Sequence, residues 1–169
     1  CHFIDTIQDK NAAILIPGCG NAYEAQYLLD QGFTNITLLD ISETAVTLIK
    51  ERFAGEEGIK VLNQDFFTHY TKYDFILEQT FFCALNPSLR KRYVEHMYEL
   101  LSPKGVLAGL LFDTFFEKDG PPFGGDEEEY MSLFSEKFDN VDFKATTLSI
   151  PQRMGTELFF SVSNIKSAI

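Results

Sequence analysis

Residues 14–24 (ILIPGCGNAYE) constrain the fold more than any other stretch of the chain. An apolar run leads into a turn that contains Gly18 and Gly20, and a helical pattern follows. A buried strand that passes through a glycine turn into a helix lets the backbone approach a ligand closely. Asp40 ends the next apolar run, where a carboxylate can accept hydrogen bonds from both hydroxyls of a ribose. The pattern predicts a site for a nucleoside-containing cofactor, but the turn alone does not say which one.

Apolar runs of strand length alternate with segments of helical spacing. The expected strands cover residues 12–17, 36–40, 59–62, 73–78, 105–112, 141–150 and 155–164. The first five are mostly unbroken apolar runs, as in parallel strands that are covered on both faces. Only four residues separate the last two strands, too few for a crossover helix, so we expect these strands to pair antiparallel. The chain therefore predicts a single α/β domain over residues 1–169, with a Rossmann-like, doubly wound, seven-stranded, mostly parallel sheet and an antiparallel C-terminal strand.

Helix-end signals lie between these strands. Helices are expected over residues 21–31, 42–53, 86–101 and 126–138. Asn21 and Glu24 have the spacing of a capping box, and Gly32 follows as a C-terminal stop. Ser42 is expected to cap the second helix.

Charge and cysteine content exclude several classes of protein. The 14 Lys and Arg against 25 Asp and Glu give a net charge of −11 with no basic run, which disfavours nucleic-acid and anionic-membrane partners. No apolar stretch approaches the roughly 20 residues of a membrane span. Cys1, Cys19 and Cys83 form neither a disulfide framework nor a metal-ligand spacing, and no signal peptide is seen. We expect a cytoplasmic protein, monomeric or alternatively a homodimer, without a metal site.

Two features distinguish between nucleoside cofactors. A nicotinamide dinucleotide site prefers a small residue where this chain has Tyr23. A seven-stranded sheet that ends in a hairpin with one reversed strand is associated with S-adenosylmethionine-dependent methyltransferases. Because both folds use a ribose-binding acid, Asp40 does not separate them.

Four segments, in order, resemble the thiopurine S-methyltransferase family, which includes plant and microbial thiol and halide methyltransferases. The segments are 16–20 (IPGCG), 81–90 (FFCALNPSLR), 97–105 (MYELLSPKG) and 120–123 (GPPF). The resemblance runs from about residue 12 to residue 164. It implies the class I methyltransferase fold, S-adenosylmethionine as methyl donor, S-adenosylhomocysteine as product and a small-molecule acceptor.

The chain differs from the family at its N-terminus. Members of the family carry an N-terminal segment, often with tryptophans, that folds over cofactor and substrate. Here about eleven residues precede the first expected strand, and there is no Trp. This lid segment is therefore expected to be absent from the chain, which affects the substrate pocket most.

The resemblance assigns cofactor contacts to the ends of the first two strands. Gly18, Cys19 and Gly20 would form the turn beneath the methionine part and the ribose. The Cys19 thiol itself is interpreted as a packing group, because no base lies beside it in the sequence. Asp40, with Ile41 after it, would bind the ribose diol, and its alternative role is to cap the following helix.

Further cofactor contacts are expected at the third and fourth strand ends. Asp65 and Phe66 would hold the adenine, although Asp65 could also be a simple strand-end acid. Glu78 and Gln79 would lie next to the methyl group, where a carboxylate attracts the amino group or sulfonium of the cofactor. Glu24 either complements the helix N-terminus or contacts the methionine end.

Four residues are predicted on the substrate side: Arg90, Phe82, Phe115 and Phe123. Arg90 matches the arginine of the family's Asn-Pro-x-x-Arg motif and could orient an anionic substrate, because a guanidinium offers paired donors. Its alternative is a solvated arginine beside Lys91. The aromatic residues lie at strand ends or in loops, where about half are expected only to pack.

No histidine is convincing as a general base, since His69 lies in a polar loop and His96 in a helix beside its core face. This absence suits a thiolate or halide acceptor, which needs alignment and dehydration rather than proton removal. The leading interpretation is methyl transfer to a thiol, thiocyanate, halide or aromatic thiol such as a thiopurine. The alternatives are methylation of an amine or hydroxyl, a cofactor-binding module that is inactive without its lid, and a nicotinamide oxidoreductase.

Overall fold

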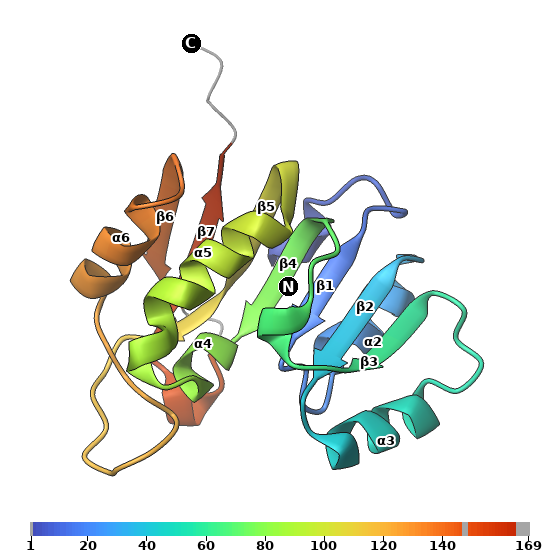
Figure 1. The fold of residues 1–169 in the computed structure, drawn as a ribbon, viewed down its shortest axis with the longest axis horizontal. Coiled ribbons are helices and arrows are strands. Elements are labelled where there is room, and N and C mark those ends of the chain that lie inside the picture. The colour runs from blue at the N-terminus through green and yellow to red at the C-terminus, as the bar shows by residue number, and fades with distance from the viewer. Residues whose placement is uncertain (1, 147–148, 165–169) are drawn as a thin grey trace.

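The computed structural model describes residues 2–146 and 149–164. A seven-stranded sheet forms its centre, with the strand order β3-β2-β1-β4-β5-β7-β6 (Figure 1). The strands are β1 (Ile14–Pro17), β2 (Ile36–Asp40), β3 (Ile59–Asn63), β4 (Tyr73–Gln79), β5 (Leu101–Phe112), β6 (Asn140–Ala145) and β7 (Glu157–Ser163). In these two ranges, no helix is long and apolar enough to cross a membrane.

The pairing confirms the predicted topology. Strands β1 to β5 pair parallel, whereas β7 pairs antiparallel with both β5 and β6. The last two strands are shorter than expected: β6 ends at Ala145 and β7 begins at Glu157, because a 3-10 turn, η3 (Pro151–Arg153), lies between them. Residues 147–148 of the expected strand over 141–150 lie outside the described residues.

Helices flank the sheet. The α-helices are α1 (His2–Asp5), α2 (Tyr23–Asp30), α3 (Glu43–Arg52), α4 (Phe81–Ala84), α5 (Arg90–Leu100) and α6 (Glu127–Ser135), and the other 3-10 turns are η1 (Phe66–Thr68) and η2 (Pro87–Leu89). Of these, α2, α3, α5 and α6 lie in segments where the sequence predicts a helix, whereas the sequence does not predict α1 or α4. Ser42 caps α3 by accepting a hydrogen bond from the Ala45 amide at 3.3 Å, which confirms the predicted cap.

Several predicted helix ends are wrong: the helix expected over residues 86–101 begins at Arg90, after η2, and the one expected over residues 126–138 ends at Ser135. The capping box of Asn21 and Glu24 does not form, because Ala22 takes a left-handed conformation (φ 52°) and delays the start of α2. The third helix ends at Leu100, and β5 already begins at Leu101 rather than at residue 105. Leu101 pairs with Tyr73 of β4 before a shift in register, so tertiary pairing extends the strand through a segment that reads as a helix stop.

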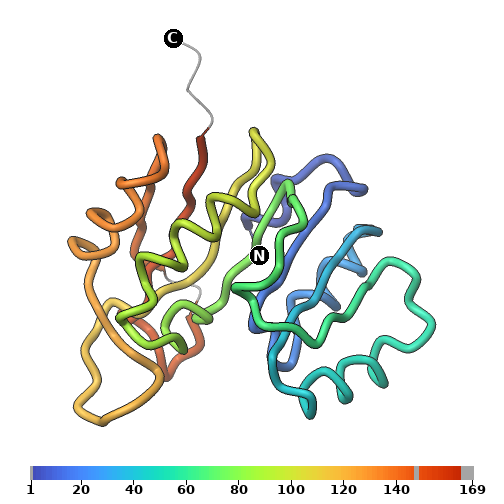
Figure 2. Tube along the Cα trace, in the orientation of Figure 1, coloured from blue at the N-terminus to red at the C-terminus, as the bar shows by residue number. Residues whose placement is uncertain are grey.

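Two hydrophobic cores cover the two faces of the sheet. Along β1, Leu15 points into the core formed with α4, α5 and α6, whereas Ile14 and Ile16 point into the core formed with α1, α2 and α3. This alternation follows from the period of two in a strand. Figure 2 shows the coils of α5 (yellow-green) and α6 (orange) side by side on one face of the sheet.

The first of these cores is rich in aromatic rings. The Phe82 ring lies 5.0 Å from Tyr93 and 5.5 Å from Tyr130, centroid to centroid. The Phe134 ring lies 5.3 Å from Phe160 of β7. Such edge-on and tilted pairs favour a fixed arrangement of rings, so α4, α5 and α6 are held as one layer.

The carboxyl ends of the parallel strands meet at one edge of the sheet, the lower edge in Figure 1. Successive strands are added on one side of β1 up to β3 and on the other side from β4 onward, so the topological switch point lies between β1 and β4. Ligands of open α/β sheets bind outside the carboxyl ends of the strands at such a point. The long segment 113–126 hangs below this edge (Figure 1). The candidate site therefore lies at the carboxyl ends of the strands, near β1 and β4.

Candidate active site

The glycine turn after β1 requires its glycines. Gly18 and Gly20 have φ values of +58° and +49°, a region that glycine adopts without strain. The Gly18 amide donates to the Leu39 carbonyl at 2.7 Å, which holds the turn against β2. A Cβ on Gly18 would lie 2.3 Å from Cδ2 of Phe81, so the ring that follows β4 packs directly on the turn.

Asp40 joins the glycine turn to the start of α3. Its Oδ2 accepts a hydrogen bond from the Gly20 amide at 3.3 Å, and its Oδ1 accepts one from the Ser42 amide at 2.9 Å. The Asn63 side chain donates to the backbone carbonyls of Asp40 and Ile41, each at 3.1 Å. An ionised carboxylate has about four acceptor positions, so each oxygen keeps a lone pair. Asp40 therefore has the helix-start role and still fits a ribose diol.

Cys19 and Glu24 lie on either side of the start of α2. The Cys19 thiol is buried, and burial together with the nearby Asp40 charge raises its pKa to about 12. Such a thiol stays protonated and inert, in keeping with the packing interpretation. Burial also raises the pKa of Glu24, in the first turn of α2.

Asp65 and Phe66 follow β3 as predicted, but both have local structural partners. Asp65 accepts a hydrogen bond from the Phe67 amide at 2.9 Å and so caps η1. The Phe66 ring is buried against Phe81, with 5.2 Å between the ring centroids. The Phe66 carbonyl also lies 2.8 Å from Nε2 of His96. Contact of this pair with adenine remains a prediction.

Glu78 is a buried acid at the end of β4, with only 3% of its surface exposed. Its Oε1 accepts a hydrogen bond from the Phe82 amide at 2.7 Å, whereas Oε2 has no hydrogen-bond partner among the described residues. Burial raises the pKa of Glu78 to about 8, although the amides of Phe82 and Phe81 oppose this effect. The carboxyl group thus lies beneath the first turn of α4, one position before the exposed Gln79.

Because burial raises the pKa of Glu78, we expect the free energy of unfolding to fall as the pH rises from about 4.5 to about 8. In that window the folded chain retains a proton on Glu78 that the unfolded chain has released. The expected slope is about 1.4 kcal/mol per pH unit from this group. Urea unfolding at several pH values, compared with Glu78→Gln, measures it, because the amide keeps an acceptor for Phe82 and does not titrate. Equal slopes in both proteins would contradict the assignment.

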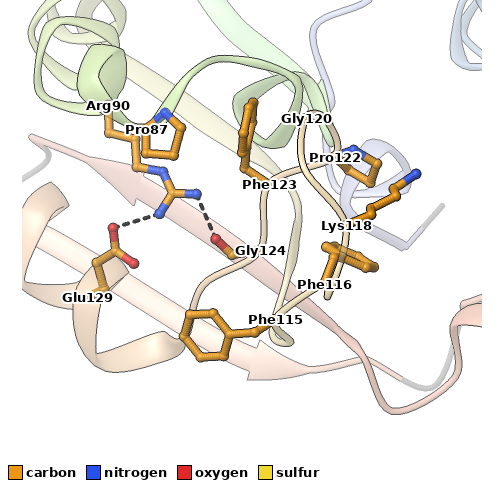
Figure 3. A pocket seen from close by; sticks show the side chains of 10 residues that line it. All are labelled: Pro87, Arg90, Phe115, Phe116, Lys118, Gly120, Pro122, Phe123, Gly124 and Glu129. Atoms are coloured by element: carbon orange, nitrogen blue, oxygen red, sulfur yellow. Dashed lines mark hydrogen bonds and ion pairs between the residues drawn. The ribbon is translucent and has the colours of Figure 1, made fainter.

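A pocket of about 390 Å³ brings together three of the four predicted substrate-side residues (Figure 3). Arg90, Phe115 and Phe123 line it, together with Pro87, Phe116, Lys118, Gly120, Pro122, Gly124 and Glu129. Phe82, the fourth prediction, is fully buried and does not line the pocket; its ring centroid lies 4.9 Å from the Arg90 guanidinium carbon. The 113–126 segment supplies most of the wall.

Arg90 is held rigidly and is not a solvated arginine. Only 5% of its surface is exposed. Nη1 lies 2.6 Å from Oε1 of Glu129, and Nη2 donates to the Gly124 carbonyl at 2.7 Å (Figure 3). Nε has no hydrogen-bond partner in the described part of the chain. The sequence predicts Arg90 as a substrate-side residue but does not indicate Glu129, because three consecutive glutamates begin α6 and nothing local separates them.

His69 and His96 are buried and each has a hydrogen-bond partner within the fold. The His69 Nε2 lies 2.7 Å from the Tyr73 hydroxyl, and burial lowers the His69 pKa. Across the ranges that the structure describes, no group of three or more His, Cys, Asp or Glu residues could hold a metal ion.

Comparison with known proteins decides between the possible families. The model of the family described as "Thiopurine S-methyltransferase (TPMT)" matches residues 1–162. The chain belongs to the thiopurine S-methyltransferase family. It is accordingly an S-adenosylmethionine-dependent methyltransferase with the class I fold.

Two plant proteins are similar to this family member over most of its length. One, from Arabidopsis thaliana, is described as "Probable thiol methyltransferase 2", and the chain is 32% identical to it over 162 residues, covering 92% of this chain and 71% of the relative. The other, "Thiocyanate methyltransferase 1" from the same plant, is 31% identical over 167 residues with the same coverage.

Solved methyltransferase structures share the fold. The glycopeptide N-methyltransferase MtfA, crystallised with S-adenosylhomocysteine, superposes with a TM-score of 0.76 at 12% identity. The match covers 96% of this chain and 86% of that structure. At this identity the likeness supports the architecture of this methyltransferase and does not extend to its acceptor.

Proposed function

We propose that this methyltransferase transfers the methyl group of S-adenosylmethionine to a small soft nucleophile: a thiol, thiocyanate or halide, or an aromatic thiol such as a thiopurine. The observation behind the proposal is the pocket of Figure 3, whose lining combines a buried cation, Arg90, with the rings of Phe115, Phe116 and Phe123. A cation beside apolar side chains suits an anion that must lose its hydration shell before it reacts.

The charged groups of the pocket do not favour general-base chemistry. Glu129 is its one carboxylate among the described lining residues, and Arg90 already binds it at 2.6 Å. Transfer to a hydroxyl or amine needs a group that removes a proton. A thiolate or halide has no such need, and correct alignment alone can lower the barrier by up to about 7–11 kcal/mol. The lining therefore favours a sulfur or halide acceptor.

The residues at the carboxyl edge of the sheet would hold the cofactor. Gly18 and Gly20 would let the backbone approach it, and the free lone pairs of Asp40 would accept from the ribose hydroxyls. Asp65 and Phe66 would bind the adenine, and Glu78 and Gln79 would lie beside the reacting end. When bound, S-adenosylmethionine supplies an electrophilic methyl group on a sulfonium.

The names of the two Arabidopsis relatives support this acceptor class, since they name thiol and thiocyanate. A panel of acceptors tests the proposal. S-adenosylhomocysteine formation would be measured with bisulfide, thiocyanate, iodide, an aromatic thiol, a phenol and an aniline. We expect turnover with one or more sulfur or halide acceptors and none with the phenol or aniline. Turnover confined to the phenol or the aniline would contradict the proposal.

A further inference from the structure

Arg90 and Glu129 form an unequal ion pair at the edge of the pocket. The Arg90 side chain is 6% exposed, whereas that of Glu129 is 44% exposed. Arg90 is fixed on three sides, by the Gly124 carbonyl and by the rings of Phe82 and Tyr130, which lie 4.9 Å and 5.8 Å from its guanidinium carbon. Glu129 is held to it by one short contact between Nη1 and Oε1. The cation is thus a fixed part of the pocket, and the anion can turn away into water.

A cation as buried as Arg90 needs a counterion when the pocket is empty, because an unpaired buried charge is strongly destabilising. Glu129 supplies that charge. An acceptor that carries its own anionic group offers the same interaction, and the two negative groups cannot share the guanidinium face without repelling each other.

We infer that Glu129 is a resident counterion, which the anionic group of an acceptor displaces from Arg90, and that Glu129 thereby sets how strongly the pocket selects anionic acceptors. This rests on the proposed function, since it assigns Arg90 to the acceptor side. Arg90 stays in place during the exchange, while Glu129 moves to solvent at the exposed start of α6.

Two aromatic thiols that differ by one carboxylate test the inference. The Michaelis constants of para-mercaptobenzoate and benzenethiol would be measured for the wild type, Glu129→Gln and Glu128→Gln. Glutamine at residue 129 can still accept a hydrogen bond from Nη1 but no longer competes as an anion. Glu128→Gln is the matched control, because it removes the same charge from the same exposed helix turn outside the pocket lining.

For Glu129→Gln, the ratio of the Michaelis constant of para-mercaptobenzoate to that of benzenethiol is expected to fall about fivefold. Glu128→Gln should change neither. A merely structural ion pair would leave the ratio of the two constants at its wild-type value in Glu129→Gln, and that result would overturn the inference.

Failure of the proposed function would look different. If the wild type methylates neither thiol and no other soft acceptor, the proposed function fails, and Glu129 is then tested by binding alone. Calorimetric titration with benzoate, in the presence of S-adenosylhomocysteine, should show tighter binding to Glu129→Gln than to the wild type. Equal affinities in the two proteins would overturn the inference without reference to turnover.

Discussion

Replacing Asp40 with alanine is expected to weaken binding of S-adenosylmethionine by about tenfold to a hundredfold or more. Each charge-assisted hydrogen bond to a ribose hydroxyl contributes about 1.5–3 kcal/mol. The substitution also removes the acceptor for the Gly20 amide, which loosens the glycine turn on which the cofactor would lie. Calorimetric titration with S-adenosylhomocysteine measures the effect directly.

Two variants separate this role from a structural one. Asp40→Asn keeps the shape but replaces one acceptor oxygen with a donor, so it should lose most of the affinity. Glu43→Gln removes one charge from the exposed first turn of α3 and should bind as the wild type does. Wild-type affinity in a folded Asp40→Ala protein would remove Asp40 from the cofactor site.

Replacing Arg90 with alanine is expected to raise the Michaelis constant of an acceptor that carries a carboxylate by about tenfold to a hundredfold. Without the guanidinium, the carboxylate of the acceptor loses about 1.5–3 kcal/mol of charge-assisted hydrogen bonding. An acceptor of the same shape without the carboxylate should be affected much less. Steady-state kinetics on para-mercaptobenzoate and benzenethiol give the two values.

Arg90→Ala should also lower the free energy of unfolding, by about 2–4 kcal/mol, because Arg90 ties α5 to Gly124 and to α6. Arg90→Lys keeps the charge but loses the planar fork, so it should recover only part of the selectivity. Lys91→Ala is the control, since it removes an exposed ion pair with Glu136. Equal effects on both thiols would place Arg90 outside the acceptor site.

The architecture could be predicted from the sequence because its signals are local. Unbroken apolar runs indicate parallel strands that are covered on both faces, and a connection without a crossover helix favours an antiparallel final pair. Both kinds of pairing are seen in the sheet, although the last two strands are further apart in the chain than the four residues expected. The Ser42 cap was predictable for the same reason, since its partner lies three residues away.

Other features depend on contacts that no local pattern contains. Ala22 and Thr80 adopt positive φ values at the turns after β1 and β4, although neither residue type favours that region, and the first of these moves the start of α2. Residues 101–104 join β5 because β4 pairs with them. In each case tertiary structure overrides the residue preference.

The candidate site also combines features that local sequence patterns predict with features that depend on tertiary contacts. The glycine turn and Asp40 follow from strand–turn–helix rules, and the structure joins them by the hydrogen bond from Gly20. The ion pair between Arg90 and Glu129 links residues 39 positions apart in the chain, so only the packing of α6 against α5 selects Glu129 from its neighbours. The burial of Glu78 beneath α4 was likewise invisible in the sequence.

The most direct test of methyl transfer to a soft nucleophile uses S-adenosylmethionine with a deuterated methyl group and para-mercaptobenzoate as acceptor. This acceptor offers both a sulfur and a carboxylate oxygen, and mass spectrometry distinguishes the two products. Methyl transfer to a soft nucleophile predicts the deuterated thioether, formed together with an equal amount of S-adenosylhomocysteine. A deuterated methyl ester in place of the thioether, or no methylated product from this or any other soft acceptor by a protein that binds the cofactor, would contradict it.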